Sequence, residues 1–328
     1  YTLSRVCPSL GIIRIVDHRG VTERLIYQVI LFLKKRMVFI QLLINSLIAG
    51  AVYALVASGF SLIYATSKFI HFAHGATVAF SAYILYFFFS MVGLNFWLSA
   101  LLSIIFAALL GWLMNILIFK QLRKRKASGV ILLIASFGLL ILLESLILLL
   151  FSSNVKTIGY IGAAKGLEFL GAIITPLQIF IVVISFILLG LLFFFMKKTK
   201  TGKAMRAVSD NKDVAEIVGI SSERIYSWAF IIGSAIAGIA GILVGLEQNL
   251  TPMMGTSLMI GGFTGAIIGG IGSVPGAILG SFLLGIAENF GIWYLPSSYK
   301  DAIAFVLLFL FLLFKPRGIL GIKRSGDR

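Results

Sequence analysis

The sequence has little charge and almost no cysteine. Only 12% of its 328 residues are charged, whereas a soluble domain is roughly one-quarter charged. Cys7 is the single cysteine, so an intrachain disulfide cannot form. The low charge excludes an ordinary soluble domain, and the lone cysteine says little about the redox compartment.

The sequence also lacks the common motifs of catalysis. Gly202 and Lys203 resemble part of a phosphate-binding Walker A loop, but Lys197 stands where the first glycine belongs and Ala204 replaces the serine or threonine. No Ser/His/Asp set and no pair of acids stands out as catalytic. We therefore expect no enzymatic activity, no cofactor and no ATP hydrolysis by this route.

Long hydrophobic runs dominate what is present. Hydrophobic residues make up 59% of the chain, and the mean hydropathy is +1.05. Several runs exceed the ~20 residues needed to cross a bilayer, so we predict an all-α, polytopic helical membrane protein. The net charge of +16 could suggest nucleic acid. The basic residues instead gather at 120–126, 197–206, 315–324 and in the first 36 residues, which is typical of cytoplasmic loops.

The apolar runs predict about nine transmembrane crossings, some of them short and broken. If the three internal basic clusters are all cytoplasmic, an even number of crossings separates successive clusters. The segment 259–290 must then cross twice, and a single long crossing there would give eight. The expected spans are 38–66, 69–89, 94–119, 129–151, 176–196, 228–246, 259–271, 276–290 and 302–314.

The first 36 residues differ from the rest. They hold seven of the 28 basic residues and the only cysteine, and Met37 opens directly into an apolar run. We expect 1–36 to be a non-native or flexible N-terminal extension and 37–328 to be one transmembrane domain. The alternative is a genuine amphipathic arm on Leu25 to Leu33. Basic residues at 34–36 would favour the cytoplasmic side, which conflicts with nine crossings unless the extension is not native.

The longest internal polar stretch is 197–226. Basic residues come first, and 210–220 predicts a short helix with Ala215, Val218 and Gly219 on one side. Small and apolar residues alternate with the charges, and a merely solvated loop has no need of an apolar face. We expect a cytoplasmic segment that grips a soluble partner, bracketed by turns at Gly202 and Gly219. The alternative is a solvated loop with ordinary cytoplasmic charge.

Two short segments interrupt the apolar runs, IHFAHG at 70–75 and GGIGSVPG at 269–276. Glycine-interrupted segments in both halves of a membrane protein point to a solute path. For most glycines close helix packing is the alternative, because small residues recur at every fourth position in 237–245, 261–269 and 272–280. The path candidates are His71, Phe72, His74, Gly75, Glu144, Gly270 and Gly272.

Three ionisable residues among these candidates need separate treatment. His71 and His74 have no cysteine or carboxylate near them in sequence, so hydrogen bonding in a packed interior is favoured over a metal site. Glu144 lies in the middle of a span, where a charge costs ~2.5–3.5 kcal/mol on the insertion scale. It must be neutral, paired or directed to a polar cavity.

Three stretches in order carry a family resemblance: GFSLIYATSKFIHFAHG (59–75), TKTGKAMRAVSDNKDVAEIVGI (199–220) and GGIGSVPGAILGSFLLGIAEN (269–289). Together with KPRGILG (315–321), they closely resemble the permease subunits of branched-chain amino-acid ABC importers over about 38–322. The resemblance implies a multi-pass permease domain in a bacterial or archaeal plasma membrane. It also implies as partners a second homologous permease, two ABC ATPases that bind the ATP, and an extracytoplasmic solute-binding protein.

The resemblance assigns the polar stretch to ATPase contact. The matching positions are Thr201, Gly202, Arg206, Ala207, Glu216 and Gly219, and Lys203 is available for carboxylates on the partner. The chain departs from the family pattern at His71, where asparagine is usual, and at Ala76, where glutamate is common. Branched-chain amino acids are the expected solute, with urea or short amides as the alternative. An uncoupled solute channel is the competing class.

Overall fold

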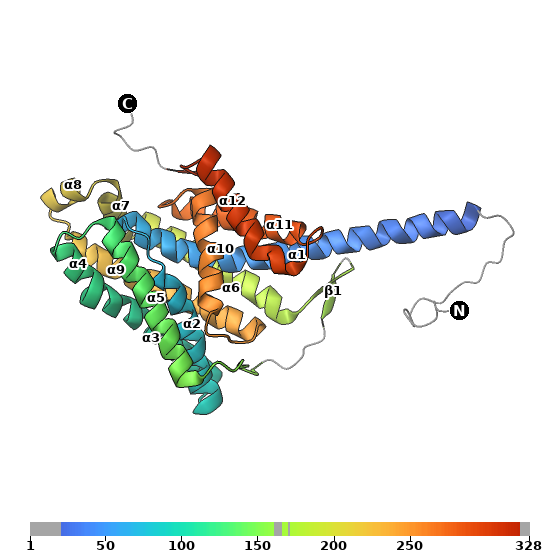
Figure 1. Ribbon diagram of the computed structural model, residues 1–328, viewed down its shortest axis with the longest axis horizontal. Coiled ribbons are helices and arrows are strands. Elements are labelled where there is room, and N and C mark those ends of the chain that lie inside the picture. Colours follow the sequence, from blue (N-terminus) through green and yellow to red (C-terminus); the bar gives the residue numbers. More distant parts are fainter. Residues whose placement is uncertain (1–20, 161–165, 170, 322–328) are drawn as a thin grey trace.

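The computed structural model describes residues 21–160, 166–169 and 171–321, with the side chains of 21–35 and Phe169 outside that description. The chain folds as a helical bundle with one small β-hairpin (Figure 1). The elements are α1 (Val21–Ser67), α2 (Ala73–Tyr86), α3 (Phe96–Met114), α4 (Lys120–Lys124), α5 (Gly129–Phe151), β1 (Leu167–Phe169), β2 (Ala172–Ile174), α6 (Pro176–Lys198), α7 (Lys200–Asp210), α8 (Lys212–Ile217), α9 (Ser222–Glu247), α10 (Met254–Gly269), α11 (Val274–Gly291) and α12 (Lys300–Phe314).

The helices pass between two opposite ends of the bundle. At one end, Lys68, Arg123 and Glu223 line a common cavity between the ends of α1, α4 and α9. The tail after α12 reaches the same end, where Ile319 N donates to Ile268 O at the end of α10 (2.9 Å). We call this the cytoplasmic end, because the internal basic clusters lie there. At the extracytoplasmic end, the segments that follow α5 and α9 are joined by a backbone bridge between Lys156 and Leu250.

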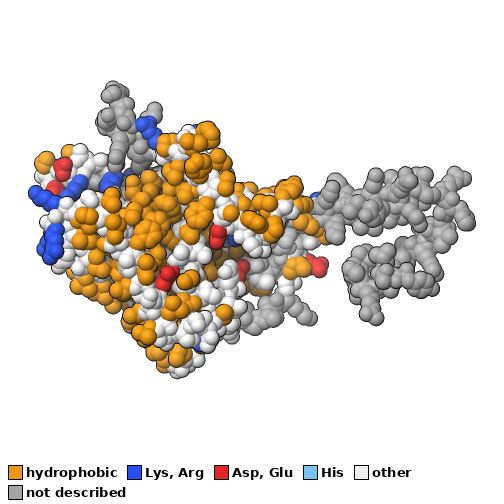
Figure 2. Space-filling model, in the orientation of Figure 1, with side chains coloured by type: hydrophobic (Ala, Val, Ile, Leu, Met, Phe, Trp, Pro, Cys, Tyr) orange, Lys and Arg blue, Asp and Glu red, His pale blue; other side chains and the backbone are white. Residues whose placement is uncertain are grey.

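This arrangement confirms the predicted fold class. Within the described residues, eight helices are long and apolar enough to cross a membrane, and α10 is a shorter apolar helix. Together they agree with about nine crossings. Hydrophobic side chains cover most of the visible face, and Lys and Arg gather at the end that holds α4, α7 and α8 (Figure 2). Such a surface suits a protein surrounded by lipid with one charged end in water.

Local signals in the sequence explain several helix starts. Thr175 and Gln178 form a reciprocal capping box at the start of α6, and Pro176 occupies the first turn. Ser128 accepts from Ile131 N before α5, and Ser273 accepts from Gly276 N before α11. The predicted span at 129–151 coincides with α5. Pro275, read from the sequence as an interruption, lies in the first turn of α11, where proline is tolerated.

The structure corrects three predicted boundaries. The second span was expected from Phe69, but 68–72 is irregular and α2 begins at Ala73; Lys68 has a left-handed φ of 60° that ends the preceding helix. The single helix expected at 210–220 is α8 alone, because extended Asn211 (φ −152°) separates it from α7. The first span is part of the longer helix α1, which begins at Val21 and projects beyond the bundle (Figure 1). The nature of 1–36 stays a prediction, and 1–20 lies outside the described residues.

Most of the predicted glycine positions do serve close packing. α10 and α11 approach so closely that a Cβ on Gly269 or Gly280 would overlap backbone atoms of the other helix. Gly261 similarly faces the ring of Tyr53 on α1, with 2.6 Å from an added Cβ to Cε1. Small residues thus let α10 and α11 lie backbone against backbone, as expected for helices that associate within lipid.

Candidate functional site

The predicted polar loop forms two short helices at the cytoplasmic end, and α7 lies against the bundle. Thr199 Oγ1 accepts from Gly202 N at 3.0 Å and caps α7. Gly202, Met205 and Val208 are buried, and a Cβ on Gly202 would lie 2.7 Å from Met196 Cα. The structure therefore corrects the turn expected at Gly202, which lies inside the first turn of α7. This glycine permits close contact with the end of α6.

α8 presents an apolar surface to water. Asn211 Oδ1 accepts from Asp213 N and Val214 N at 3.0 and 3.1 Å, and Gly219 ends the unit with a φ of 86°. The turn expected at Gly219 is thus confirmed. Ala215 faces inward, whereas Ile217 is 83% exposed. We call the exposed residues Val214, Ile217 and Val218 the α8 tip. An apolar cluster at the charged end of a membrane protein is typical of a contact surface for another protein.

The charged residues of this segment lie on α7 and α8, and two of those on α7 line a neighbouring cavity. Lys203, Arg206 and Glu216 are exposed, and Glu216 forms an i,i+4 pair with Lys212 (3.9 Å). Lys203 and Arg206 line a cavity of about 610 Å³ that also contacts Gly272 and the ends of α1 and α6. The predicted residues Thr201 and Ala207 lie half-buried on α7. The seven predicted contact residues therefore share one end of the molecule, on adjacent helices.

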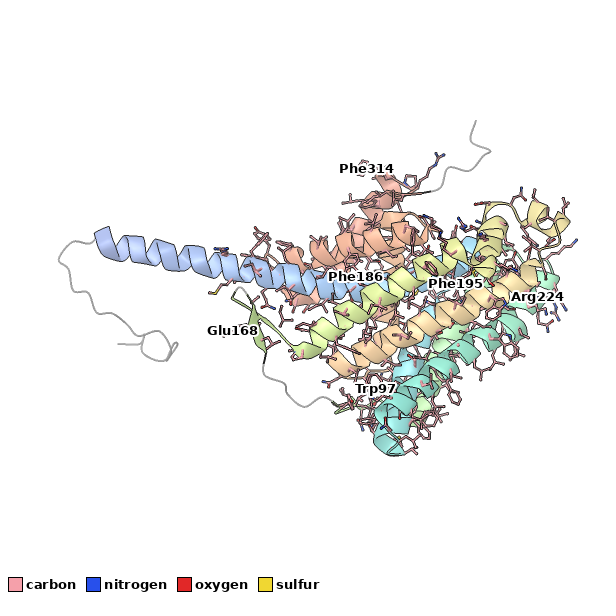
Figure 3. The ribbon with its side chains drawn as sticks, turned by 180° about the vertical axis from the view of Figure 1, so that it is seen from behind. Trp97, Glu168, Phe186, Phe195, Arg224 and Phe314 are labelled. Carbon is pink, nitrogen blue, oxygen red and sulfur yellow. The ribbon has the colours of Figure 1, made fainter. Side chains whose placement is uncertain are left out.

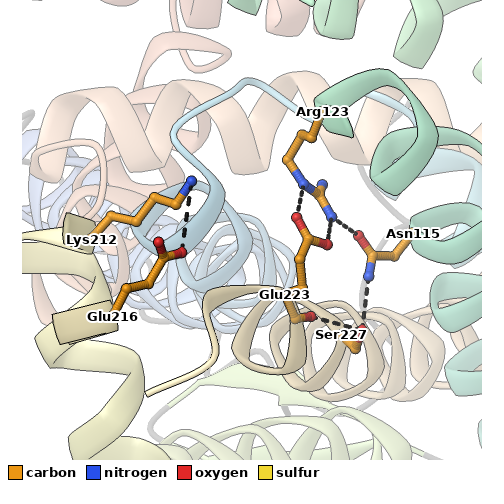
Figure 4. Close-up of polar contacts among 6 residues, drawn as sticks. All are labelled: Asn115, Arg123, Lys212, Glu216, Glu223 and Ser227. Atoms are coloured by element: carbon orange, nitrogen blue, oxygen red, sulfur yellow. Dashed lines mark hydrogen bonds and ion pairs between the residues drawn. The ribbon is translucent and has the colours of Figure 1, made fainter. Parts of the chain in front are cut away.

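An ion-pair network that the sequence did not reveal fixes α4 to the start of α9 (Figure 4). Arg123 donates to both carboxylate oxygens of Glu223, at 3.0 and 2.9 Å, and to Asn115 Oδ1 at 2.8 Å. Asn115 donates to Ser227 Oγ at 3.0 Å. Arg123 also lies over the Tyr226 ring, 4.7 Å from its centre. No local pattern could have indicated a pair separated by 100 positions. The network holds the segment that follows α8 in a fixed position.

His71 lies in the irregular stretch before α2 and is fully buried. Its Nδ1 is 3.2 Å from Ser136 Oγ on α5, and the same hydroxyl accepts from Ala73 N at 3.0 Å. Rings of Phe119 and Phe230 lie at 5.0 and 4.9 Å between centres. The structure thus matches the expectation of a histidine hydrogen-bonded in a packed interior. Ser136 ties the start of α2 to α5.

The remaining candidates of the first segment meet α5 and α10 inside the bundle. Phe72 stacks on Phe137 of α5 and contacts Phe263 of α10, with ring centres 4.3 and 5.1 Å apart. His74 is buried beside α1. A Cβ on Gly75 would lie 2.7 Å from Gly255 O, so α2 and α10 cross closely there.

Glu144, on α5, also contacts α10. Its side chain is partly exposed on the bundle surface and accepts a hydrogen bond from Thr256 Oγ1 at the start of α10. The expected need of this mid-span carboxylate for a polar partner is therefore met. We call the group formed by His71, Phe72, Gly75 and Glu144 with their α5 and α10 contacts the intramembrane cluster.

The two candidates of the second segment lie elsewhere. Gly270 and Gly272 have φ values of 116° and 89°, which a glycine adopts easily. Gly270 is covered by the tail after α12, and an added Cβ would lie 2.7 Å from Gly321 N. Gly272 lines the cavity beside α7. The structure therefore places both glycines at the cytoplasmic end, Gly272 beside α7 and Gly270 under the tail after α12, and neither in the intramembrane cluster.

The comparison with known proteins decides the family. A family model described as the branched-chain amino acid transport system / permease component matches residues 42–312, most of the chain. The chain belongs to this family. It is a multi-pass permease subunit of the plasma membrane, and such subunits work in transporter complexes with other subunits.

Named relatives agree with this assignment. The high-affinity branched-chain amino acid permease BraD of Pseudomonas aeruginosa is 35% identical over 86% of this chain and 96% of its own. LivH of Escherichia coli is 32% identical over 86% of this chain and 96% of its own. A relative from an archaeon, the probable LivH of Methanocaldococcus jannaschii, is 30% identical over 85% of this chain and 91% of its own. The match thus extends over nearly the full length of bacterial and archaeal permeases.

Proposed function

We propose that this permease subunit translocates branched-chain, hydrophobic amino acids that an extracytoplasmic binding protein delivers to an ABC importer. A second homologous permease completes the pore, and two ABC ATPases bind and hydrolyse the ATP. The substrate follows from the family and from relatives that carry this solute in their names. No cofactor is needed on the permease itself.

The exposed α8 tip is the observation that carries the coupling role. Ile217 and Val218 are 83% and 68% exposed at the cytoplasmic end of the bundle, on a short helix among charged residues. Exposed apolar side chains next to Lys203, Arg206 and Glu216 suit a helix that inserts into a groove on a soluble ATPase. An uncoupled channel has no use for such a surface, so the α8 tip favours the importer over the channel.

The intramembrane cluster supports a path along α5 and α10. Glu144 and Phe137 reach the bundle surface on α5, and Phe72 contacts both Phe137 and Phe263 of α10. A partly exposed carboxylate within a span is unfavourable against lipid but suits a water-containing pathway. We assign this face to the half-pore, with the second permease opposite.

Uptake measurements test the proposal. In cells without other branched-chain uptake systems, expression of this chain with its companion subunits should restore entry of labelled leucine. Entry should require ATP and the binding protein. Uptake of urea or short amides in place of leucine would support the alternative solute, and entry that persists without ATPase and binding protein would support the channel.

A further inference from the structure

A small polar cavity lies at the extracytoplasmic end, away from the intramembrane cluster and from α7. It holds about 290 Å³ between α1, α6 and α9 to α12, near the lower limit of small-molecule pockets, ~300 Å³. Its lining combines both signs of charge, amides and aliphatic side chains: Asn45, Ile48, Ala49, Val52, Tyr53, Gln178, Val244, Glu247, Gln248, Leu258, Asn289 and Lys300.

The two carboxylates at this cavity differ in their partners, because Glu288 pairs with a cation and Glu247 has a hydrogen bond from a neutral amide. Glu288 lies behind it with a side chain only 2% exposed, and it accepts from Tyr53 Oη at 2.9 Å and pairs with Lys300 Nζ at 3.5 Å. Glu247 in the lining accepts from Gln178 Nε2 at 3.2 Å. A neutral amide does not balance a carboxylate charge. Glu247 therefore offers an acceptor for a ligand cation, whereas Glu288 already has its cation in Lys300.

Lys300 can serve a second anion at the same time. An ammonium group carries three donors, and the Lys300 side chain is 37% exposed while it pairs with Glu288. Its remaining donors can bind a ligand carboxylate. Glu247 and Lys300 line the same cavity, so the acceptor for a cation and the donor for an anion face one space. That is the charge pattern that an α-amino acid requires.

The rest of the lining suits an aliphatic side chain. Ile48 and Val52 of α1 are buried, as is Val244 of α9, and Leu258 of α10 is half-buried. These side chains come from α1, α9 and α10 and form the apolar part of a lining whose charged groups, Glu247 and Lys300, lie on α9 and α12. A ligand with an ammonium, a carboxylate and a short aliphatic group would satisfy each part of the cavity.

We propose that this cavity is a binding site for a free hydrophobic α-amino acid. Glu247 binds the ammonium group, Lys300 binds the carboxylate, and Ile48, Val52, Val244 and Leu258 contact the aliphatic side chain. The site lies within one permease subunit, so it does not need the second permease to be complete. The choice of leucine as ligand rests on the proposed function; the zwitterionic class rests on the cavity alone.

Binding of leucine and two truncated analogues tests the site. The full chain, purified in lipid nanodiscs with its co-purifying subunits and free of soluble binding protein, should bind leucine. Binding of 4-methylpentanoate, which lacks the ammonium, and of 3-methylbutylamine, which lacks the carboxylate, should be weaker by at least about tenfold, as expected for loss of one charged hydrogen bond.

Variants assign each charge to its residue. Glu247→Gln should weaken leucine binding by at least about tenfold and leave 4-methylpentanoate binding unchanged, since that analogue has no ammonium for Glu247 to bind. The double variant Glu288→Gln/Lys300→Gln removes the ion pair as a unit, so no charge is left buried alone. It should weaken leucine and leave 3-methylbutylamine unchanged. Glu168→Gln, exposed in the β-hairpin at the same end, is the control and should bind as the unaltered chain does.

Equal leucine affinity in the unaltered chain and in Glu247→Gln would overturn the site, as would undetectable leucine binding to the unaltered chain. These outcomes are separable from failure of the proposed function. If Glu247→Gln binds leucine as tightly as the unaltered chain and cells take up leucine normally, the site is wrong and the importer stands. If the cavity binds other zwitterions through Glu247 and Lys300 while leucine uptake is absent, the site stands and the solute assignment is wrong.

Discussion

Among single residues, Glu144 is an ionisable side chain in the middle of a membrane span. Its carboxylate lies within a span and receives a hydrogen bond from Thr256. Glu144→Gln keeps a hydrogen-bond acceptor and the side-chain shape, so it should be tolerated. Glu144→Leu leaves Thr256 without this acceptor and should cost about 1–3 kcal/mol of stability. Thermal unfolding in detergent measures the difference. Glu168→Leu on the exposed hairpin is the control, and an unaffected Glu144→Leu would show that the carboxylate merely faces headgroups.

A second prediction at the scale of side chains concerns the ion pair of Arg123 and its effect on the unfolding temperature. Its guanidinium binds Glu223 through two parallel hydrogen bonds and Asn115 through a third (Figure 4). Removing one partner leaves a partly buried charge alone, whereas removing both does not. We therefore expect Arg123→Gln/Glu223→Gln to unfold at a higher temperature than Arg123→Gln alone. Additive losses in the double-mutant cycle would contradict a coupled pair.

At the scale of elements, α8 should couple ATP use to transport without touching solute. Ile217→Asp places a charge on the α8 tip, Gly219→Val conflicts with a φ of 86°, and Glu216→Arg reverses an exposed charge. All three should abolish uptake and reduce transport-stimulated ATP hydrolysis by the assembled complex. Membrane insertion and binding-protein affinity should not change. Arg224→Gln, exposed beyond the tip, is the matched control.

Wild-type uptake in these three variants, with normal ATPase co-purification, would mean that α8 is only solvated. The loss of the Lys212–Glu216 pair in Glu216→Arg does not complicate the result, because an exposed pair contributes only about 0.2–1 kcal/mol.

Elements differ in how far the sequence predicts them. The span at 129–151 matched α5, because a long apolar run with a serine cap can only be a helix in a bilayer. The second span was predicted to begin too early, at Phe69, because the irregular stretch 68–72 depends on a left-handed Lys68 and on a Ser136 hydroxyl from another helix. Contacts between distant residues, such as Arg123 with Glu223, leave no local trace. The candidates for a solute path could be named from the sequence. The sequence could not show that they separate into the intramembrane cluster and the two glycines at the cytoplasmic end.

At the scale of the whole molecule, the two ends should face opposite sides of the membrane. Glu168 and Arg224 lie at opposite ends of the bundle (Figure 3). On a Cys7→Ser background, a membrane-impermeant maleimide should label Glu168→Cys in intact cells and Arg224→Cys only after permeabilisation. Both residues are exposed, so access should depend on the side and not on burial. Labelling of both in intact cells would contradict the nine-crossing topology.

The tail after α12 has a consequence for how the protein is made. Ile319 and Leu320 donate their backbone N–H groups to the carbonyls of Ile268 and Gly269, and so close the turn between α10 and α11. A chain emerging from the ribosome meets its earlier segments first. Helices α10 and α11 can therefore insert before their turn is closed, and that turn stays open until the tail after α12 has been made. A chain released before this tail is made would leave the carbonyls of Ile268 and Gly269 without these donors, and this open turn would distinguish a truncated product from the longer chain.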